Sequence, residues 1–499
     1  MKFTSKFSFI PILMILALNI FIFSLNSCTT LDFIEEKISA VLDFPSKSST
    51  SKSSKTSNTS ETVSFKYAVP KDFSKAYSFR TDLPDEISKK IPAEIKNLKT
   101  SNPTSYVQKC CDFINANTSD SFQKVKIAHD IVALNTKYDA KSFWSGTIPL
   151  QNYENVLKTG LAVCEGYSNL LKKFLDTLGF QNVKVHGYAR GVEFSLLDEK
   201  TVSSNHAWNL VKIEGEYYFI DSTWDSGYMN GKSSVQKYAT DYLFIKPEHF
   251  IYTHFPENKT FQLLENPISN SEFLTLADFR PKFFEVAENF SIITENNFLE
   301  NQNSQISNEN SINKFIKKQT QTSSSIQTEY NLKNDCLLKF VVTQDETKSQ
   351  KNNLTFTQTD ETKTFTTIQF PSSGLYKIEI FYYKKNSRQG WSVAQFFVDA
   401  KSSSSILYPQ IFSNSFEAKI ISPIEMPLKK GETYHFEINC PERKFLALIN
   451  GRNFIQMQMS ENGNFTLDFE IPSNTKTLNI AASNSERASY QAIARYICE

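Results

Sequence analysis

The sequence predicts an α+β domain followed by two β-sandwich-like domains, and three patterns support this fold class. Apolar residues recur at helical spacing between Phe122 and Val132, and again between Leu170 and Leu178. Strand-like runs follow the second of these helices, and helices followed by antiparallel strands are typical of α+β domains. From about residue 337 onward the chain consists of short strand patterns separated by turn residues, which favours β-sandwiches.

Length, charge and aromatic content limit what the chain can be. Its 499 residues suffice for about three domains on the usual length prior. The 54 basic and 53 acidic residues nearly cancel, so the chain has no large basic field and nucleic acid is not an expected partner. The 42 Phe and 21 Tyr residues favour strands and a substantial core.

The N-terminus has the pattern of a targeting segment. Lys2 and Lys6 precede an apolar run over residues 9–25, as in a secretory signal. The following Leu25-Asn-Ser-Cys28 resembles the lipobox of bacterial lipoproteins. This resemblance implies that the signal is removed and that Cys28 carries a lipid, which would anchor the protein to a membrane of the cell envelope. The alternative is an uncleaved membrane helix, because about 17 apolar residues can just span a bilayer.

A polar segment then separates the anchor from the first folded domain. Residues 46–60 contain only Ser, Thr, Lys and Asn, and such a composition cannot bury enough surface to fold. We therefore expect a flexible tether at this point. The expected organisation is a signal peptide (1–27), a tether (28–61), the α+β cysteine domain (62–282), a β-rich domain (283–402) and a C-terminal β-sandwich-like domain (403–499).

Within the α+β domain the pattern predicts helices first and strands second. Residues 84–98 and 105–114 are short helix candidates, and Ser119 or Ser121 can cap the helix that begins near residue 121. A helix over residues 165–178 ends at Gly179, a typical C-cap residue. The expected strands cover residues 183–188, 206–213 and 217–221.

In the C-terminal half, residues 294–328 are rich in Asn, Ser and Gln and predict a linker or a long polar loop. Residues 365–373 and 465–474 resemble each other as a weak internal repeat, although similar strand and turn chemistry would produce the same likeness. The expected strands of the two β-rich domains are 337–343, 365–370, 375–383, 392–398, 434–439, 445–449, 454–459, 465–471 and 477–481.

Cys164 stands where a thiol is readily activated. It directly precedes the predicted helix 165–178, so its sulfur would lie near free backbone N–H groups and the positive end of the peptide dipoles. This position favours the thiolate over the thiol. The same N–H groups can hold the oxyanion of a tetrahedral intermediate.

His206 and Asp221 are related by a predicted hairpin. A two-residue turn at Glu214-Gly215 pairs Ile213 with Glu216 and places Asp221 opposite Trp208. His206 lies two residues from Trp208 and therefore on the same face as Asp221. Loops of even length keep the imidazole and the carboxylate together, whereas loops of odd length separate them.

Each of these residues also has an ordinary explanation. A lone Cys at a helix start is usually a small packed residue, a lone His is usually a satisfied core or surface group, and an Asp after a strand is usually a turn residue. The chain has no CxxC pair, so a zinc or thioredoxin-type site is not expected. Cys440 and Cys498 either pair with each other or remain buried thiols, and Cys110, Cys111 and Cys336 have no expected role.

The three segments in combination resemble the transglutaminase-like superfamily, a papain-like fold with a Cys-His-Asp triad. They are Gly160-Leu-Ala-Val-Cys164-Glu-Gly-Tyr, Ser204-Asn-His206-Ala-Trp-Asn-Leu-Val and Tyr218-Phe-Ile-Asp221-Ser-Thr-Trp-Asp. The segments 124–139 and 241–264, which include His254-Phe-Pro256, narrow the resemblance to the kyphoscoliosis-peptidase branch. The resemblance covers residues 122–284.

The resemblance implies that Cys164 is the nucleophile, His206 the general acid and base, and Asp221 the group that orients His206. Trp208 and Trp224 are expected as walls of the substrate site, with core packing as the alternative. Gln151 is a candidate oxyanion donor, or else an ordinary surface residue. The chemistry would use no cofactor and no metal, and the substrate would be a protein or peptide.

Two enzymatic outcomes of this chemistry stay open, and so does a competing functional class. Water attacking the thioester would make the protein a peptidase or amidase, whereas an amine would make it a crosslinking acyltransferase. The competing class is a non-catalytic surface-binding protein that keeps the core as a scaffold. Arylamine acetyltransferases share the triad, but the sequence contains no pattern for a coenzyme A site.

Overall fold

The computed structural model describes residues 67–499, apart from 192–193, 295–314, 334–335, 345–353, 361–362, 385–386, 388, 413–417 and 486–488. The chain divides into two units, Met1–Ser64 and Phe65–Glu499, and only the second contains described residues. The predicted signal peptide, Cys28 and the tether lie outside the described residues. Among the described helices, none has both the length and the apolar character required to cross a membrane.

A five-stranded antiparallel sheet forms the centre of the α+β domain. Its strand order is β8-β5-β4-β3-β9, so strands that follow one another in sequence are paired except at β9. The sequence-based strands are confirmed within one residue or so at each end, with Asp221 directly after the last residue of β5. The strands are β3 (Asn182–Ala189), β4 (His206–Ile213), β5 (Glu216–Ile220), β8 (Leu243–Ile245) and β9 (His254–Pro256).

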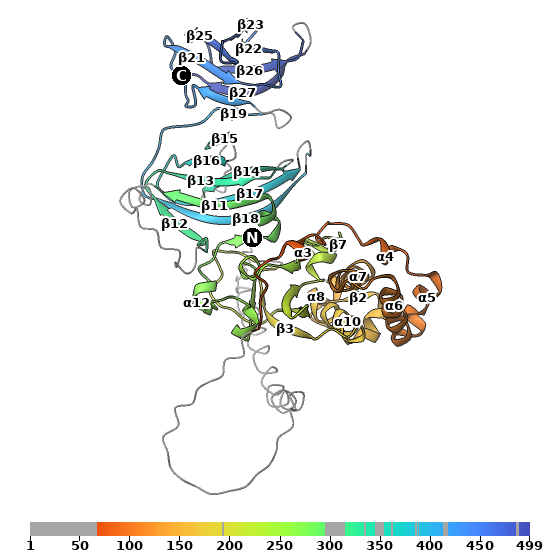
Figure 1. The fold of residues 1–499 in the computed structure, drawn as a ribbon. Helices are drawn as coiled ribbons and strands as arrows, with labels where there is room; N and C mark the ends of the chain where they lie inside the picture. Colours follow the sequence, from red (N-terminus) through yellow and green to blue (C-terminus); the bar gives the residue numbers. More distant parts are fainter. Residues whose placement is uncertain are drawn as a thin grey trace, which may run out of the picture. The chain divides into compact units, whose positions relative to one another are not determined.

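Helices α7 and α10 pack on one face of this sheet, and Figure 1 shows α5 and α6 gathered beside them. Val211, Ile213 and Ile220 of the sheet share a hydrophobic cluster with apolar residues of α7 and α10. The region expected as one helix over 84–98 is divided in two, because Pro92 lacks an N–H and stands at the start of the second. The helices are α3 (Ser74–Tyr77), α4 (Glu86–Lys89), α5 (Ala93–Ser101), α6 (Pro103–Asn117), α7 (Ser121–Asn135), α8 (Ala140–Ser145), α9 (Tyr153–Thr159) and α10 (Cys164–Thr177).

The ends of α7 and α10 follow standard capping chemistry. Asp120, and not Ser119 or Ser121, caps α7, because its side chain accepts the free N–H of Gln123 at 2.9 Å. Helix α10 ends as expected before Gly179, whose φ of +84° suits glycine. Beyond it, the N–H of Phe180 donates to the carbonyl of Leu175, which closes the helix.

The opposite face of the sheet packs on aromatic residues. Trp208 and Leu210 of β4 point to this side, as the alternation of a strand requires, and they pack with Phe219 and Phe250. The smaller elements that complete the domain are β1 (Lys137–Tyr138), β2 (Leu161–Ala162), η1 (Trp224–Ser226), β6 (Gly227–Asn230), β7 (Ser233–Gln236), α11 (Pro247–Phe250), η2 (Lys259–Gln262) and α12 (Asn270–Phe273).

The hairpin between β4 and β5 has the predicted two-residue turn. Ile213 pairs with Glu216, and Asn209 pairs with Ile220, which is the register that an even turn requires. Glu214 and Gly215 both have positive φ, +53° and +96°, as in the turns that suit the twist of a hairpin. His206 and Asp221 therefore emerge at the same edge of the sheet.

The first β-rich region contains two sheets. One has the order β10-β18-β17-β14 with β12 alongside β18, and the other has the order β11-β13-β16-β15. The polypeptide joins this region through β10 and α13 (Pro281–Val286), because β10 pairs with β18. Its strands are β10 (Asp278–Phe279), β11 (Ala287–Thr294), β12 (Gln319–Thr322), β13 (Ser325–Leu332), β14 (Cys336–Gln344), β15 (Thr355–Asp360), β16 (Lys363–Gln369), β17 (Gly374–Lys384) and β18 (Gly390–Ala400).

The expectation of a linker or loop over residues 294–328 is wrong in its second half. Residues 319–322 and 325–328 belong to β12 and β13, although residues 295–314 lie outside the description. In β13 the buried positions are Ile326, Thr328 and Tyr330, so the strand alternates as a strand should. Polar Thr and Gln side chains in this segment hid the alternation from a reading based on hydrophobicity.

The last region repeats the same arrangement. Its sheets have the orders β20-β21-β25-β24 and β19-β27-β26-β22-β23. The two segments of the weak internal repeat fall in β16 and β25, which each take the third place in a four-stranded sheet. Residues 454–459 are two strands rather than one, with a break at buried Met457. The strands are β19 (Gln410–Ile411), β20 (Lys419–Ser422), β21 (Thr433–Asn439), β22 (Phe445–Asn450), β23 (Asn453–Gln456), β24 (Gln458–Met459), β25 (Asn464–Glu470), β26 (Thr477–Ser483) and β27 (Gln491–Ile497).

Candidate active site

Cys164 is the first residue of α10, and its side chain is partly exposed. Val163 before it has an extended conformation and provides no side-chain cap, so the first turn of the helix leaves backbone N–H groups free. This is the environment that the sequence predicts for an activated thiol.

Gln151 holds the turn that leads to this cysteine. Its side-chain oxygen accepts the N–H of Val163 at 2.9 Å, and its amide nitrogen donates to the carbonyl of Pro149 at 2.9 Å. A Cβ on Gly166 would lie 2.5 Å from that side-chain oxygen, so only glycine fits there. One amide N–H of Gln151 is thus engaged with Pro149, and Gln151 contacts the backbone before Cys164 through its oxygen.

His206 and Asp221 meet at the end of the β4–β5 hairpin. His206 Nε2 lies 2.8 Å from Asp221 Oδ2, and the two side chains are 8% and 1% exposed. The other carboxylate oxygen, Oδ1, accepts the backbone N–H groups of Thr223 at 2.9 Å and Trp224 at 3.3 Å. The carboxylate therefore has a fixed orientation toward the imidazole.

Charges in the site favour an imidazolium on His206. Burial lowers the pKa of His206, but the charge of Asp221 and the charge and hydrogen bond of Cys164 outweigh burial and raise the pKa to about 10. Burial alone would raise the pKa of Asp221, yet the His206 cation and hydrogen bonds from His206 and His254 hold it well below its usual range. Since Nε2 of His206 faces Asp221, Nδ1 is the ring nitrogen left to face the thiol.

A second histidine completes the surroundings of Asp221, and the sequence analysis gave it no role. His254 Nε2 lies 3.2 Å from the same Oδ2 that binds His206, and the ring is fully buried. His254 begins β9, whose pairing with β3 places it beside the hairpin. Its segment was part of the family resemblance, but no spacing rule connects residue 254 with residue 221.

The two expected tryptophans take different places around these groups. Trp208 is fully buried beneath His206, with 6.1 Å between the ring centroids, and forms part of the core. Trp224 lies 5.6 Å from His206 and 4.5 Å from His254 and borders a cavity. Trp224 therefore borders the cavity, whereas Trp208 lies in the core beneath His206.

This cavity opens beside His206 and has a volume of about 520 Å³. Eight of its 22 lining residues are aromatic, and the basic groups Arg280 and Lys137 also border it. Arg280 is paired with Asp278 at 2.9 Å, so its charge is largely compensated. The aromatic lining residues are Tyr138, Phe143, Tyr167, Tyr188, Phe194, Trp224, Tyr228 and Tyr242.

His206, Asp221 and His254 are also the three described groups whose ligand atoms could gather around a metal ion, since these atoms lie within 4.8 Å of one another. Both Nε2 atoms, however, approach a single carboxylate oxygen at hydrogen-bonding distance, which requires protons where a metal would stand. The geometry therefore fits a hydrogen-bonded cluster, and the absence of a metal stays a prediction.

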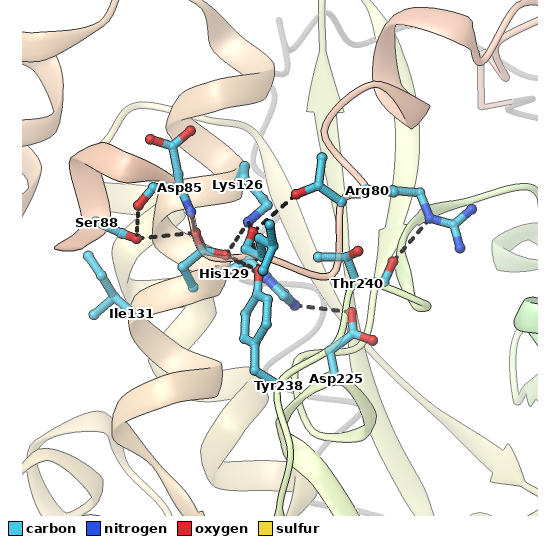
Figure 2. A network of polar contacts seen from close by, with 12 residues as sticks. Arg80, Asp85, Ser88, Lys126, His129, Ile131, Asp225, Tyr238 and Thr240 are labelled. Carbon is cyan, nitrogen blue, oxygen red and sulfur yellow. Dashed lines mark hydrogen bonds and ion pairs between the residues drawn. The ribbon is translucent and has the colours of Figure 1, made fainter. Parts of the chain in front are cut away.

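A second buried polar network lies behind the site, and Figure 2 shows its members. Lys126 and Asp130 of α7 form an ion pair at 2.7 Å, and His129 Nε2 lies 3.1 Å from Asp225 Oδ2. Tyr238 bonds to both Lys126 and Asp130. Asp225 belongs to η1, four residues after Asp221, so this network anchors α7 to the segment that carries the catalytic carboxylate candidate.

Cys110, Cys111, Cys440 and Cys498 are buried, whereas Cys164 and Cys336 are partly exposed. Burial raises the pKa of Cys110 and Cys111 to about 12 and that of Cys440 to about 11. Cys440 and Cys498 are separate buried thiols, which is the second of the two alternatives expected from the sequence.

Comparison with known proteins places this site in a family context. Residues 108–222 match the model of the Transglutaminase-like superfamily. Kyphoscoliosis peptidase of Mus musculus is 36% identical over 121 residues, which is 24% of this chain and 18% of the relative. Hillarin of Drosophila melanogaster is 28% identical over 145 residues, or 26% of this chain and 17% of the relative. The chain thus spans less than a fifth of the length of these relatives.

Solved structures with a local likeness include the crystal structure of a TGase, at 17% identity and a TM-score of 0.20, covering 29% of this chain and 36% of that chain. Fibronectin(III)-like modules of Clostridium thermocellum CbhA match at 11% identity and a TM-score of 0.14, covering 36% and 89%. The chain has a transglutaminase-like core followed by β-sandwich-like domains, which confirms the fold class expected from the sequence.

Proposed function

We propose that this protein is a cysteine-dependent acyl-transfer enzyme, acting as a peptidase or as a protein-glutamine acyltransferase. Cys164 is the nucleophile, His206 the general acid and base, and Asp221 the carboxylate that orients His206. The observation that carries the proposal is the 2.8 Å hydrogen bond between His206 and Asp221, with Cys164 at the start of α10 as the other group that raises the pKa of His206.

The reaction follows from these positions. The Cys164 thiolate attacks an amide carbonyl of the substrate, and the oxyanion that forms is stabilised by free N–H groups at the start of α10. The imidazolium of His206 gives its proton to the leaving amine as the C–N bond breaks, which leaves a thioester on Cys164. His206, now neutral, takes a proton from water or from a second amine as that nucleophile attacks the thioester and releases the thiolate.

The cavity beside His206 favours a polypeptide substrate. Its aromatic lining and its volume of about 520 Å³ suit a large side chain next to the reacting carbonyl rather than a small amide alone. Tyr228 and Phe143 border it and are 43% and 39% exposed, so part of this apolar surface is accessible from solvent. We further propose that lipid on Cys28 holds the enzyme at a membrane of the cell envelope, where its substrates would be proteins.

Iodoacetamide labelling with mass spectrometry tests the chemistry. At near-neutral pH, Cys164 should react first, ahead of Cys110 and Cys111, whose burial disfavours the thiolate. His206→Ala should slow the modification of Cys164, and Asp221→Ala should slow it less. If Cys164 reacts no faster than Cys110 or Cys111, the domain is a non-catalytic scaffold, and the binding-protein alternative takes its place.

A paired assay on the purified protein separates the two enzymatic outcomes. One arm measures cleavage of unstructured protein substrates, and the other measures incorporation of a labelled primary amine into the same substrates. Cleavage without incorporation identifies a peptidase, and incorporation identifies an acyltransferase. Cys164→Ala is the control in both arms, because it removes the nucleophile and leaves the cavity intact.

The anchor is tested separately. Replacing Cys28 with Ala should abolish metabolic labelling by a radioactive fatty acid. Labelling that survives the replacement would contradict the lipoprotein proposal without affecting the proposal for the site.

A further inference from the structure

We infer that His254 is a positioning residue of the site, so that the catalytic group is a Cys-His-Asp-His tetrad in which one carboxylate is held between two imidazoles. This inference rests on the proposed function. It assigns His254 the task of holding Asp221 toward His206 through a neutral N–H donor.

The hydrogen bonds of Asp221 carry the inference. Its Oδ2 is shared by His206 Nε2 at 2.8 Å and His254 Nε2 at 3.2 Å, and its Oδ1 accepts two backbone N–H groups. A carboxylate accepts about four hydrogen bonds, so these four partners occupy its capacity. The Oδ2 atom cannot rotate away from His206 without also breaking the bond from His254.

The tautomer of His254 follows from its neighbours. A carboxylate oxygen is only an acceptor, so Nε2 of His254 must carry a proton. Nδ1 lies 2.8 Å from the hydroxyl of Thr253, which is closer than the 3.3 Å between that hydroxyl and the carbonyl of Phe250. Burial disfavours a second proton on the ring, so Nδ1 is unprotonated and accepts the Thr253 hydroxyl, and His254 is neutral with its proton on Nε2.

The surroundings of His254 keep the ring neutral and rigid. The ring stacks on Phe250 at 4.0 Å with 9° between the planes, and Trp208, Trp224 and Tyr242 enclose it. The charged groups that face it are Asp221, the His206 cation and Arg280. Burial lowers the pKa of His254 to about 4, although Asp221 opposes the shift, so of the two imidazoles only His206 is a cation at neutral pH.

A neutral donor has a distinct effect on the proposed reaction. A second cation at this position would repel the His206 imidazolium and weaken its pairing with the Cys164 thiolate. A neutral N–H fixes the carboxylate and supports its charge without that repulsion. Removal of the donor should therefore let Asp221 move and should stabilise the His206 imidazolium less. The Cys164 thiolate would then form only at higher pH.

Four proteins compared across pH 5–9 test this role: the wild type, His254→Phe, His254→Gln and His249→Phe. His254→Phe keeps a ring that can stack on Phe250 but removes the donor, whereas His254→Gln retains a side-chain N–H. His249→Phe is the matched control, because His249 stacks on Phe284 at 4.1 Å and 6° in the same way, outside the hydrogen bonds of Asp221. The readouts are the rate of Cys164 alkylation, its pH midpoint and thermal unfolding.

We expect about a tenfold slower alkylation at pH 6.5 in His254→Phe, because a hydrogen bond to a charged group contributes to the stability of the ion pair. The acidic midpoint should move to higher pH, His254→Gln should recover most of the rate, and His249→Phe should match the wild type in alkylation rate and midpoint. A folded His254→Phe variant with the wild-type rate and midpoint overturns the inference. If wild-type Cys164 is itself no more reactive than a buried thiol, the proposed function fails instead, so the two failures are distinguishable.

A measurement on the unmodified protein decides the matter if the variants do not fold. The chain has 6 histidines, and their ¹⁵N ring shifts report the position of each proton. At pH 7, His254 should be neutral with the proton on Nε2, and His206 should be doubly protonated. A His254 cation or the Nδ1–H tautomer overturns the inference, as does an alkylation rate that changes on addition of a chelator, which would assign the three groups to a metal.

Discussion

Two buried histidine–carboxylate clusters lie at the two ends of one short segment, residues 221–225, and they differ in what surrounds them. At one end, Asp221 binds His206 and His254 beside a cavity and a thiol. At the other end, Asp225 binds His129 in a network closed by Lys126, Asp130 and Tyr238 (Figure 2). Both pairs have hydrogen-bonding geometry, so the pair alone does not identify a reactive site.

The difference lies in access and in charge balance. His129, Asp130 and Asp225 are completely buried, Lys126 is 2% exposed, and the Lys126 cation compensates the Asp130 charge. Burial raises the pKa of Asp225 to about 7, and hydrogen bonds from His129 oppose the shift. This network fastens α7 to η1, whereas the Asp221 cluster borders a cavity and adjoins Cys164. We infer that the Asp225 network is structural, and that of the two clusters the Asp221 cluster is the one placed to meet a substrate.

Removal of the thiol should give the largest effect and should separate activity from stability. Cys164→Ala should reduce turnover by about 1000-fold or more, since nothing else in the site forms the covalent intermediate. The free energy of unfolding should change by less than about 0.5 kcal/mol, because the thiol is partly exposed. Urea unfolding and the assay that shows turnover provide both numbers. Cys440→Ala is the control for loss of a thiol, and an inactive Cys440→Ala would contradict this assignment.

A change in the buried network around Asp225 should give the opposite pattern, a large loss of stability. Lys126→Met leaves the Asp130 carboxylate buried without its cation, which typically costs about 3–5 kcal/mol of unfolding free energy. The exposed pair Lys172–Asp176 has the same spacing along a helix, with 40% and 46% of the two side chains exposed. Lys172→Met should cost only about 0.3–0.5 kcal/mol. Equal losses of unfolding free energy in the two variants, measured by urea unfolding, would contradict the distinction between a buried and an exposed ion pair.

A third histidine, His249, sharpens the comparison, because it has no carboxylate partner to oppose the effect of burial on its pKa. Burial, then the cations Lys246 and Arg80, lower the pKa of His249 from 6.5 to about 3. Below pH 6.5 the unfolded chain binds a proton that the folded chain does not, so stability is complete above that pH and falls as the pH decreases. The expected slope is about 1.4 kcal/mol per pH unit for this one proton.

His249→Phe should remove this slope. Between pH 6 and pH 4 the unfolding free energy of the variant should fall less steeply than that of the wild type, and the two slopes should differ by about 1.4 kcal/mol per pH unit. His435→Phe, at an exposed histidine paired with Asp468, serves as the control. An unchanged slope in His249→Phe would mean that His249 is protonated in the folded protein.

The sequence was sufficient for the parts of the site that depend on local rules. A two-residue turn fixes the register of β4 and β5, and register fixes the face of His206 and Asp221. The apolar stripe and Gly179 fix α10 and thereby place Cys164 at its start. Such features require only residues that are near in sequence or joined by a hairpin.

Contacts over long sequence distances could not be predicted in this way. His254 reaches Asp221 across 33 positions through the pairing of β9 with β3, and Asp225 reaches His129 across 96 positions. Nor could hydrophobicity reveal β12 and the start of β13, because their side chains are mostly Thr, Ser and Gln. Sequence patterns thus located the hairpin and the thiol, but not the groups that surround the carboxylate.

The smallest expected effect is a faster reaction of Cys164 when a negative charge near its thiol is removed, whereas the other changes at the site slow the reaction. Glu165 follows Cys164 directly, and burial raises its pKa, but hydrogen bonds from His186 and Lys184 outweigh burial and lower it to about 2. Its negative charge thus stands at the helix start and opposes the thiolate. Glu165→Gln should accelerate alkylation by about two- to threefold at low salt, because a charge that is partly exposed contributes only a fraction of a kcal/mol. The gain should be larger with anionic iodoacetate than with neutral iodoacetamide, and about 1 M salt should abolish it because screening shortens the range of the charge.

Glu154→Gln, in the first turn of α9, is the control and should leave the rate unchanged. A slower reaction in Glu165→Gln, or a gain that persists in high salt, would mean that Glu165 acts through the structure of the turn, and the electrostatic account of Cys164 would have to rest on His206 alone.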